Sequence, residues 1–129
     1  MGRLILDTTV LIAAERDEIN LERTIADDAD VAIAAITVGE LLVGVELAGT
    51  KRRGRRAAFV DALLDTLVVE DYTVEIAQVH ARLLAHVRRS GTPRGAHDLL
   101  IAATAVATER TIVTTDVRGF ERLPGVEVA

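Results

Sequence analysis

Four acidic residues stand where the chain changes from an apolar run to a polar step or begins a helix. Asp7 directly follows the apolar run at residues 4–6, and Asp116 follows a later run of the same kind. Glu40 and Asp98 fall in the expected first turns of two helices. Ligands of an open parallel sheet bind outside the carboxyl ends of its strands. If both helices start at that edge, the four carboxylates converge there.

A cluster of four carboxylates in a chain without cysteine is typical of a site for a hard divalent cation. Like charges a few ångströms apart raise one another's pKa, so ionising all four is costly unless cations are present. Magnesium and manganese prefer oxygen ligands, and they commonly bind through one or two carboxylates together with waters and substrate phosphates. Such a site lowers the pKa of a bound water and stabilises charge on a phosphate. The pattern therefore favours hydrolysis of phosphodiester bonds.

Each acid also has a plain structural explanation. Thr37 and Glu40 match a capping box, in which Glu40 only satisfies the amino terminus of a helix. Asp98 could complement a helix dipole, and Asp116 could be an ordinary turn residue. Asp7 is the hardest to explain in this way, because an aspartate at the end of a central, buried strand needs partners.

The elements that must position these acids alternate along the chain. No internal repeat or low-complexity linker divides the sequence, so we expect one domain over residues 1–129. Short apolar runs predict strands at residues 4–6, 31–36, 67–69, 111–114 and 126–128. Helical periodicity predicts helices at residues 10–16, 21–26, 37–47, 57–67, 74–89 and 96–110. This order predicts an α/β fold, a three-layer α/β/α sandwich around a mainly parallel sheet.

Composition excludes several classes of protein. Half of the 129 residues are hydrophobic and none is cysteine, which excludes a disordered chain, a disulfide scaffold and a thiolate zinc site. No apolar run reaches the ~20 residues of a membrane helix. The amino terminus lacks a signal-peptide pattern, so we expect a cytoplasmic protein with no membrane anchor. The formal net charge of −5 argues against non-specific nucleic-acid binding over the whole surface.

Four segments, taken in order, resemble the PIN-domain ribonucleases, and among them the VapC-type toxins of bacterial toxin–antitoxin pairs. The segments are LILDTT at residues 4–9, ITVGEL at 36–41 with Gly44, HDLLIAATA at 97–105, and IVTTD at 112–116 with Phe120. Their order and spacing and the chain length all agree with that family. The resemblance covers essentially the whole chain and implies a PIN-like fold.

The resemblance implies an endoribonuclease that depends on Mg²⁺ or Mn²⁺. It also implies an RNA substrate, a small antitoxin that docks over the site, and a homodimer. The residues that it assigns to the site are carboxylates with hydroxyls beside them. They are the catalytic acids Asp7, Glu40, Asp98 and Asp116, of which Asp7, Asp98 and Asp116 bind the metal ion, and the supporting residues Thr8 and Thr115.

Two basic features fit contact with RNA and also have ordinary explanations. The positive charge is concentrated in one run, which is either a solvated loop between helices or a surface for RNA phosphates, since arginine donates bidentate hydrogen bonds to phosphate. In the loop before Asp98, Arg94 and His97 are candidate substrate contacts, although a histidine on a helix surface is ordinary. The run consists of Lys51, Arg52, Arg53, Arg55 and Arg56, with Gly54 among them.

Two other functions compete with a nuclease. A haloacid-dehalogenase-like phosphatase also begins with a strand that ends in a nucleophilic aspartate. That pattern needs a second acid two residues later, where this chain has Thr9. A receiver-like or catalytically silent PIN module would instead bind a partner through its acidic edge, although all four expected acids are present.

Overall fold

A four-stranded, all-parallel sheet forms the centre of the molecule, in the order β3-β2-β1-β4. The computed structural model describes residues 2–24 and 27–129. Because β1 lies between β2 and β4, the strand that leads to Asp7 is internal, as predicted. The strands are β1 (Arg3–Leu6), β2 (Asp30–Ala34), β3 (Val68–Glu70) and β4 (Thr111–Val113).

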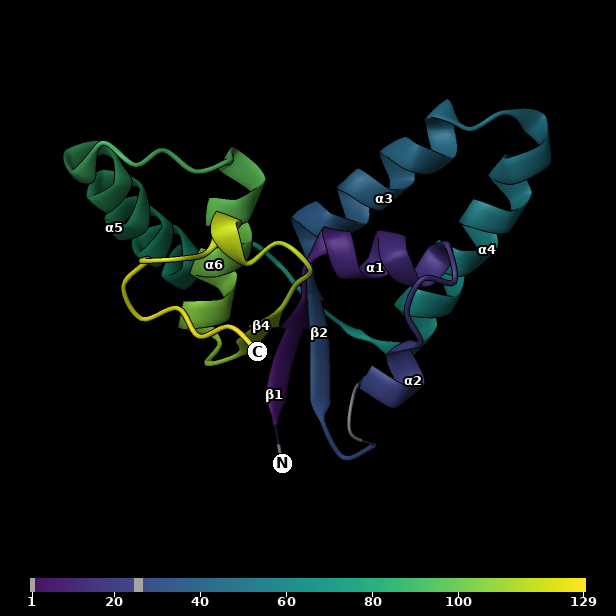
Figure 1. Ribbon diagram of the computed structural model, residues 1–129, viewed down its shortest axis with the longest axis horizontal. Coiled ribbons are helices and arrows are strands. Elements are labelled where there is room, and N and C mark those ends of the chain that lie inside the picture. The colour runs from purple at the N-terminus through teal and green to yellow at the C-terminus, as the bar shows by residue number, and fades with distance from the viewer. Residues whose placement is uncertain (1, 25–26) are drawn as a thin grey trace.

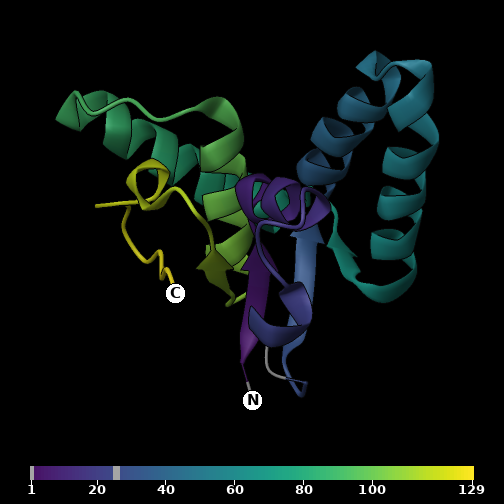
Figure 2. The same ribbon diagram turned by 45° about the vertical axis from the view of Figure 1, so that its right-hand side comes forward.

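Helices cover both faces of this sheet (Figures 1 and 2). Alternate residues of a strand point to opposite faces. Ile5 therefore packs in one core with α5 and α6, while Leu6 packs in a second core with α1 and α4. The prediction of a three-layer α/β/α sandwich is confirmed. The helices are α1 (Thr8–Glu15), α2 (Leu21–Thr24), α3 (Ala35–Leu47), α4 (Thr50–Thr66), α5 (Val74–Ser90) and α6 (Ala96–Ala107).

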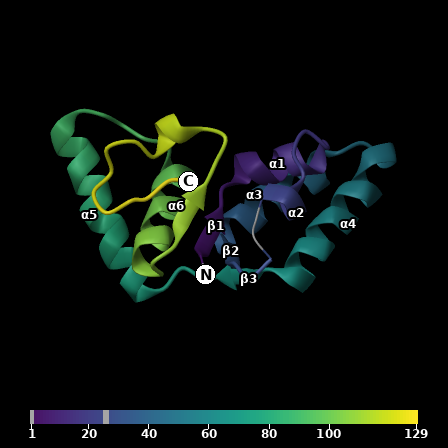
Figure 3. The ribbon, with the colours of Figure 1, turned by 60° about the horizontal axis from the view of Figure 1, so that its bottom comes forward.

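The pair α3 and α4 forms a helical hairpin on one side of the sheet, and the pair α5 and α6 lies on the other (Figure 3). The long helix α5 begins as predicted, with Thr73 as its N-cap. The Thr73 hydroxyl oxygen accepts a hydrogen bond from the backbone N–H of Ile76 at 3.2 Å. It ends at Gly91, whose φ of 69° suits glycine. No helix in the described residues is both long and apolar enough to cross a membrane.

Several predicted boundaries differ from those in the structure. The helix expected at residues 57–67 begins at Thr50, so the basic run lies in the first turns of α4 and not in a loop. Lysine and arginine are good helix formers, and this outweighs the single Gly54. The last strand is reduced to one bridge between Val128 and Ile112, after a turn at Gly125 with φ 77°. The helix predicted at 96–110 ends at Ala107, and residues 25–26 of the helix predicted at 21–26 lie outside the described residues.

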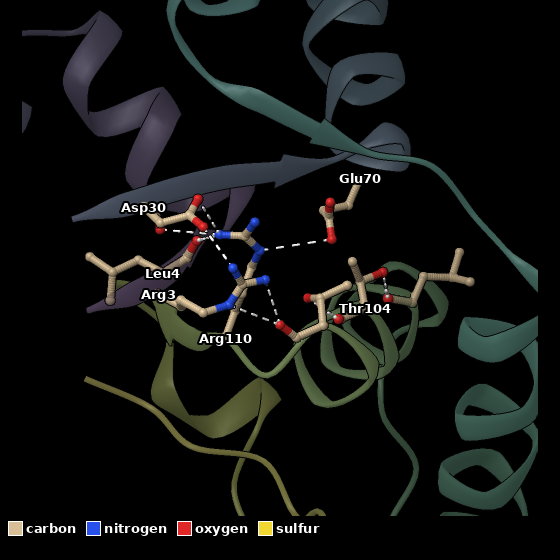
Figure 4. A network of polar contacts seen from close by, with 8 residues as sticks. Arg3, Leu4, Asp30, Glu70, Thr104 and Arg110 are labelled. Carbon is tan, nitrogen blue, oxygen red and sulfur yellow. Dashed lines mark hydrogen bonds and ion pairs between the residues drawn. The ribbon is translucent and has the colours of Figure 1, made fainter. Parts of the chain in front are cut away.

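A network of ion pairs and hydrogen bonds joins the amino ends of the strands and reaches across the sheet to β3 (Figure 4). We call Arg3, Asp30 and Arg110 the amino-end network; Glu70, the last residue of β3, joins it through Arg110. The Arg110 side chain is 3% exposed, and its Nη1 donates to Asp30 Oδ1 at 3.0 Å and to the Leu4 carbonyl at 3.2 Å. Its Nε lies 3.8 Å from Glu70 Oε2, and Arg3 Nη1 lies 2.7 Å from Asp30 Oδ2. The hydrogen bond from Arg110, with the charges of Arg110 and Arg3, lowers the pKa of Asp30 although burial opposes this.

Candidate functional site

Asp7 ends β1 and caps the amino terminus of α1. It is 3% exposed, and its Oδ1 accepts the Thr8 backbone N–H at 2.9 Å. Its Oδ2 accepts the hydroxyls of Thr9 at 2.9 Å and Thr114 at 2.8 Å. These three donors and the positive end of the helix dipole explain how the fold keeps a buried carboxylate. Neither Thr9 nor Thr114 was among the supporting residues predicted from the sequence.

Glu40 lies in the second turn of α3, so the capping-box explanation was wrong. The helix begins at Ala35, with Ala34 at the N-cap position and no side-chain cap. Alanine is a strong helix former, and the chain therefore turns into the helix two residues earlier than the polar Thr37 indicated. Thr37 is instead fully buried. Glu40 is thus free of any capping role.

Both oxygens of Glu40 have polar partners on other elements. Thr8 Oγ1 donates to Glu40 Oε1 at 2.8 Å, and His97 Nδ1 lies 2.9 Å from Glu40 Oε2. Thr8 was expected to support the acids, and its hydroxyl does contact one of them. The contact of His97 with Glu40 was not foreseen, because a histidine on a helix surface carries no distinctive pattern.

Asp98 lies in the first turn of α6, as predicted. Its partial burial raises the pKa of its carboxyl, and the negative charges of Asp7, Asp116 and Glu40 raise it further. Asp7, Asp116 and Glu40 thus each lie within electrostatic reach of Asp98. A Cβ atom at Gly119 would lie 2.7 Å from Asp98 Oδ2, so any other residue at position 119 would require this carboxylate to shift.

Asp116 lies three residues after the end of β4 and is exposed. Its backbone N–H donates to Thr114 Oγ1 at 2.9 Å, and Thr114 in turn donates to Asp7. Thr115 was expected to support the acids. Its backbone N–H donates to Thr9 Oγ1 at 3.2 Å, while its hydroxyl makes no hydrogen bond to a carboxylate among the described residues. Because Thr114 and Thr115 are adjacent and identical in type, the sequence does not indicate which of them supports the acids.

The acidic site has little basic counter-charge within the described residues. Among the described residues, no lysine or arginine forms an ion pair with any of its four carboxylates, and His97 is the one potential cation in contact. The donors are oxygens, which suit Mg²⁺ or Mn²⁺. No three Asp, Glu or His side chains in residues 2–24 and 27–129 are arranged to hold one ion together. An ion here would therefore use one or two carboxylates with waters, the usual mode for Mg²⁺.

The predicted RNA-contacting residues differ in how free they are. Arg53 pairs with Glu46 at 3.0 Å, and Arg56 donates to the Gly44 carbonyl at 3.1 Å. Arg94 donates to the carbonyl groups of Thr92, Pro93 and Glu121, which ties the loop before α6 to the segment after β4. The basic residues of α4 with exposed side chains and no ion pair in the described structure are Lys51, Arg52 and Arg55.

Comparison with known proteins places these features in one group. Residues 4–126 match the PIN domain. The chain is 32% identical over 126 residues to a protein named Ribonuclease VapC from Rickettsia bellii, covering 97% of this chain and 93% of the relative. It is 32% identical over 130 residues to the tRNA(fMet)-specific endonuclease VapC from Salmonella typhimurium, covering 99% of this chain and 97% of that protein.

The fold is also shared with a solved complex. The crystal structure of VapBC-5 from Mycobacterium tuberculosis, described as a member of the VapBC family of toxin-antitoxin systems, matches with a TM-score of 0.82 at 29% identity. The match covers 99% of this chain and 98% of that one. The match therefore extends through all the elements that position the four acids.

Proposed function

This chain belongs to the PIN-domain family, and on that premise we propose that it is an endoribonuclease that hydrolyses RNA phosphodiester bonds with a divalent metal ion. The observation that carries this proposal is the uncompensated charge of the site. Asp7, Glu40, Asp98 and Asp116 gather at the carboxyl edge of the sheet without an arginine or lysine partner in the described residues. A cation from outside the chain would supply the missing charge.

We assign Asp7, Asp98 and Asp116 to the metal site: one or two of these carboxylates would hold Mg²⁺ or Mn²⁺ directly, and the rest would reach it through bound waters. When bound, such an ion stabilises charge on the phosphate and lowers the pKa of an attacking water. Asp7 is fixed by the hydroxyls of Thr9 and Thr114, so its carboxylate is pre-oriented. Glu40 stands between donors on α1 and α6 and serves to orient water beside the ion.

The same geometry disfavours a phosphatase that uses Asp7 as a nucleophile. The residue is 3% exposed, and its two oxygens accept three hydrogen bonds. Those hydrogen bonds stabilise the carboxylate charge and reduce its tendency to attack a phosphorus atom. Asp7 is therefore better suited to ligate a cation than to form a covalent phosphoenzyme.

The relatives named VapC and the VapBC complex support a role as the toxin of a toxin–antitoxin pair. We propose a small protein antitoxin as partner, a homodimer as the assembly, and the cytoplasm as the location. We further propose that Lys51, Arg52 and Arg55 contact RNA phosphates, because they are exposed on α4 without ion pairs in the described structure. Phosphate contacts of this kind position RNA without reading its sequence.

RNA cleavage by the purified protein tests the proposal. The substrates are a transcribed messenger RNA and total transfer RNA, each with Mg²⁺ or Mn²⁺ and with excess EDTA. We expect cleavage that EDTA abolishes and that Asp7→Ala and Asp98→Ala both lose. Cleavage that persists in EDTA and in both variants would exclude the assigned site. Absence of both cleavage and Mn²⁺ binding by calorimetry would favour a catalytically silent binding module.

A further inference from the structure

His97 on α6 and Glu40 on α3 form a side-chain contact at the acidic site. His97 Nδ1 lies 2.9 Å from Glu40 Oε2, with the two side chains 52% and 27% exposed. The other oxygen of Glu40 accepts the Thr8 hydroxyl at 2.8 Å. Both oxygens of the carboxylate therefore have a partner, and rotation of the Glu40 side chain would break the hydrogen bond from Thr8 or the contact with His97.

The contact joins two parts of the fold that lie on opposite sides of the sheet. Glu40 is carried by α3, which continues into α4, whereas His97 is the second residue of α6 and directly precedes Asp98 (Figure 1). A tie between these helices sets the distance between the Glu40 and Asp98 carboxylates. Partners of this kind fix ligand orientation in metal sites, and their loss commonly costs about 10–100-fold in affinity or activity.

We propose that His97 is a positioning residue of this site, whose Nδ1–H holds the Glu40 carboxylate in the orientation that the reaction requires. The proposal rests on the ribonuclease function proposed above. It assigns the proton of the neutral ring to Nδ1, because a carboxylate can only accept a hydrogen bond. It requires no direct contact between His97 and RNA.

The first test is the tautomer of His97, which is independent of any enzymatic activity. The chain has three histidines, so each ring can be assigned by nitrogen-detected NMR. The spectra are recorded at about pH 8. We expect His97 to carry its proton on Nδ1 in the wild type and to lose that preference in Glu40→Ala. A wild-type ring protonated on Nε2 would overturn the inference whatever the activity.

The second test separates positioning from a merely structural role. His97→Ala should lower kcat for RNA cleavage about tenfold, with KM changed less than about threefold, because the lost interaction acts on the reacting geometry. His97→Asn should restore most of kcat, since its side-chain amide can donate from nearly the position of Nδ1. His86→Ala, on α5, is the matched control and should leave kcat within about twofold.

The outcomes distinguish this inference from the proposed function. Full kcat in His97→Ala, or no rescue by His97→Asn in a protein with unchanged Tm, would overturn the positioning role. A wild type that cleaves no RNA would overturn the proposed function, and with it the catalytic part of the inference. In that case the Nδ1–H tautomer would still establish the hydrogen bond to Glu40.

Discussion

The two ends of the central sheet treat their acidic residues in opposite ways. At the amino end, Asp30 accepts from both Arg3 and Arg110, and the pKa of Asp30 is lowered. At the carboxyl end, the acids around Asp98 have no arginine or lysine partner in the described residues, and the pKa of Asp98 is raised. The same chain thus neutralises acids where they support the fold. Where it leaves them uncompensated, the proposed divalent cation would supply the missing charge.

One substitution at each end of the sheet tests whether the acids there have different roles. Asp7→Asn should lower kcat/KM for RNA cleavage at least about 100-fold, or about 2.7 kcal/mol of transition-state stabilisation, because the ion loses a charged ligand. Asp30→Asn should leave kcat/KM within about twofold at temperatures where the protein is folded, while lowering its Tm. Equal losses of activity in the two variants would contradict the division of roles.

Removing the buried cation of the amino-end network should cost stability and not activity. Arg110→Met keeps much of the side-chain volume but leaves Asp30 and Glu70 without their shared partner. We expect the free energy of unfolding to fall by about 2 kcal/mol, less than for a fully buried pair because both carboxylates can reach water. Urea unfolding measures the change. An unchanged midpoint would mean that Arg110 contributes nothing net to the fold.

A divalent cation should stabilise the carboxyl end alone. At a Mn²⁺ concentration ten times its Kd, binding to the folded state adds about 1.4 kcal/mol to the free energy of unfolding. EDTA should remove this gain, and Asp7→Asn should lack most of it, whereas Arg110→Met should retain it. The readout is the urea midpoint with and without Mn²⁺. A gain of equal size in Asp7→Asn would place the ion elsewhere.

The smallest expected effect is a difference in the sign of the pH dependence. The raised pKa of Asp98 means that its stabilising contribution is present below the ordinary value of 3.8 and is lost as the pH rises through the raised pKa. The lowered pKa of Asp30 means the reverse: its contribution is present above 3.8 and is lost as the pH falls through the lowered pKa.

Without metal, Asp98→Asn should therefore be more stable than the wild type at neutral pH, by under about 1 kcal/mol because water screens the partly exposed charge. The difference should shrink as the pH approaches 3.8. Asp30→Asn should be less stable than the wild type at neutral pH, and that deficit should also shrink in acid. Unfolding curves across this range measure both. The same sign in the two variants would contradict the comparison.

The sheet and the site acids were predictable because their signals are local. Short β-branched runs that alternate with helical periodicity indicate a parallel sheet, and the acids that follow such runs must gather at its carboxyl edge. The order and spacing of the acids matched those of one family, and this identified them as a set. The polar contacts within the site were less accessible, since Thr114 and not Thr115 donates to Asp7. Which of these two hydroxyls faces Asp7 depends on the backbone conformation just after β4, and neither composition nor periodicity encodes that conformation.

Two further errors arose from competition between local signals. Thr37 and Glu40 satisfy the spacing of a capping box, yet α3 begins earlier because alanine enters a helix without a cap. The basic run contains Gly54 and was expected in a loop, yet α4 extends through it. The contact of His97 with Glu40 depends on how α3 packs against α6. The pattern of either segment alone does not predict this packing.

The pairing of β1 with β4 has a consequence for synthesis of the chain. Ile5 lies beside Ile112 in the sheet, so the central strand gains its second neighbour only after residues 111–113 have been made. Thr114 and Asp116 follow still later, and both belong to the site around Asp7. A nascent chain therefore has no complete site before residue 116 has been made. For the proposed ribonuclease, this order of assembly delays activity until the segment through Asp116 has been synthesised and has joined β1.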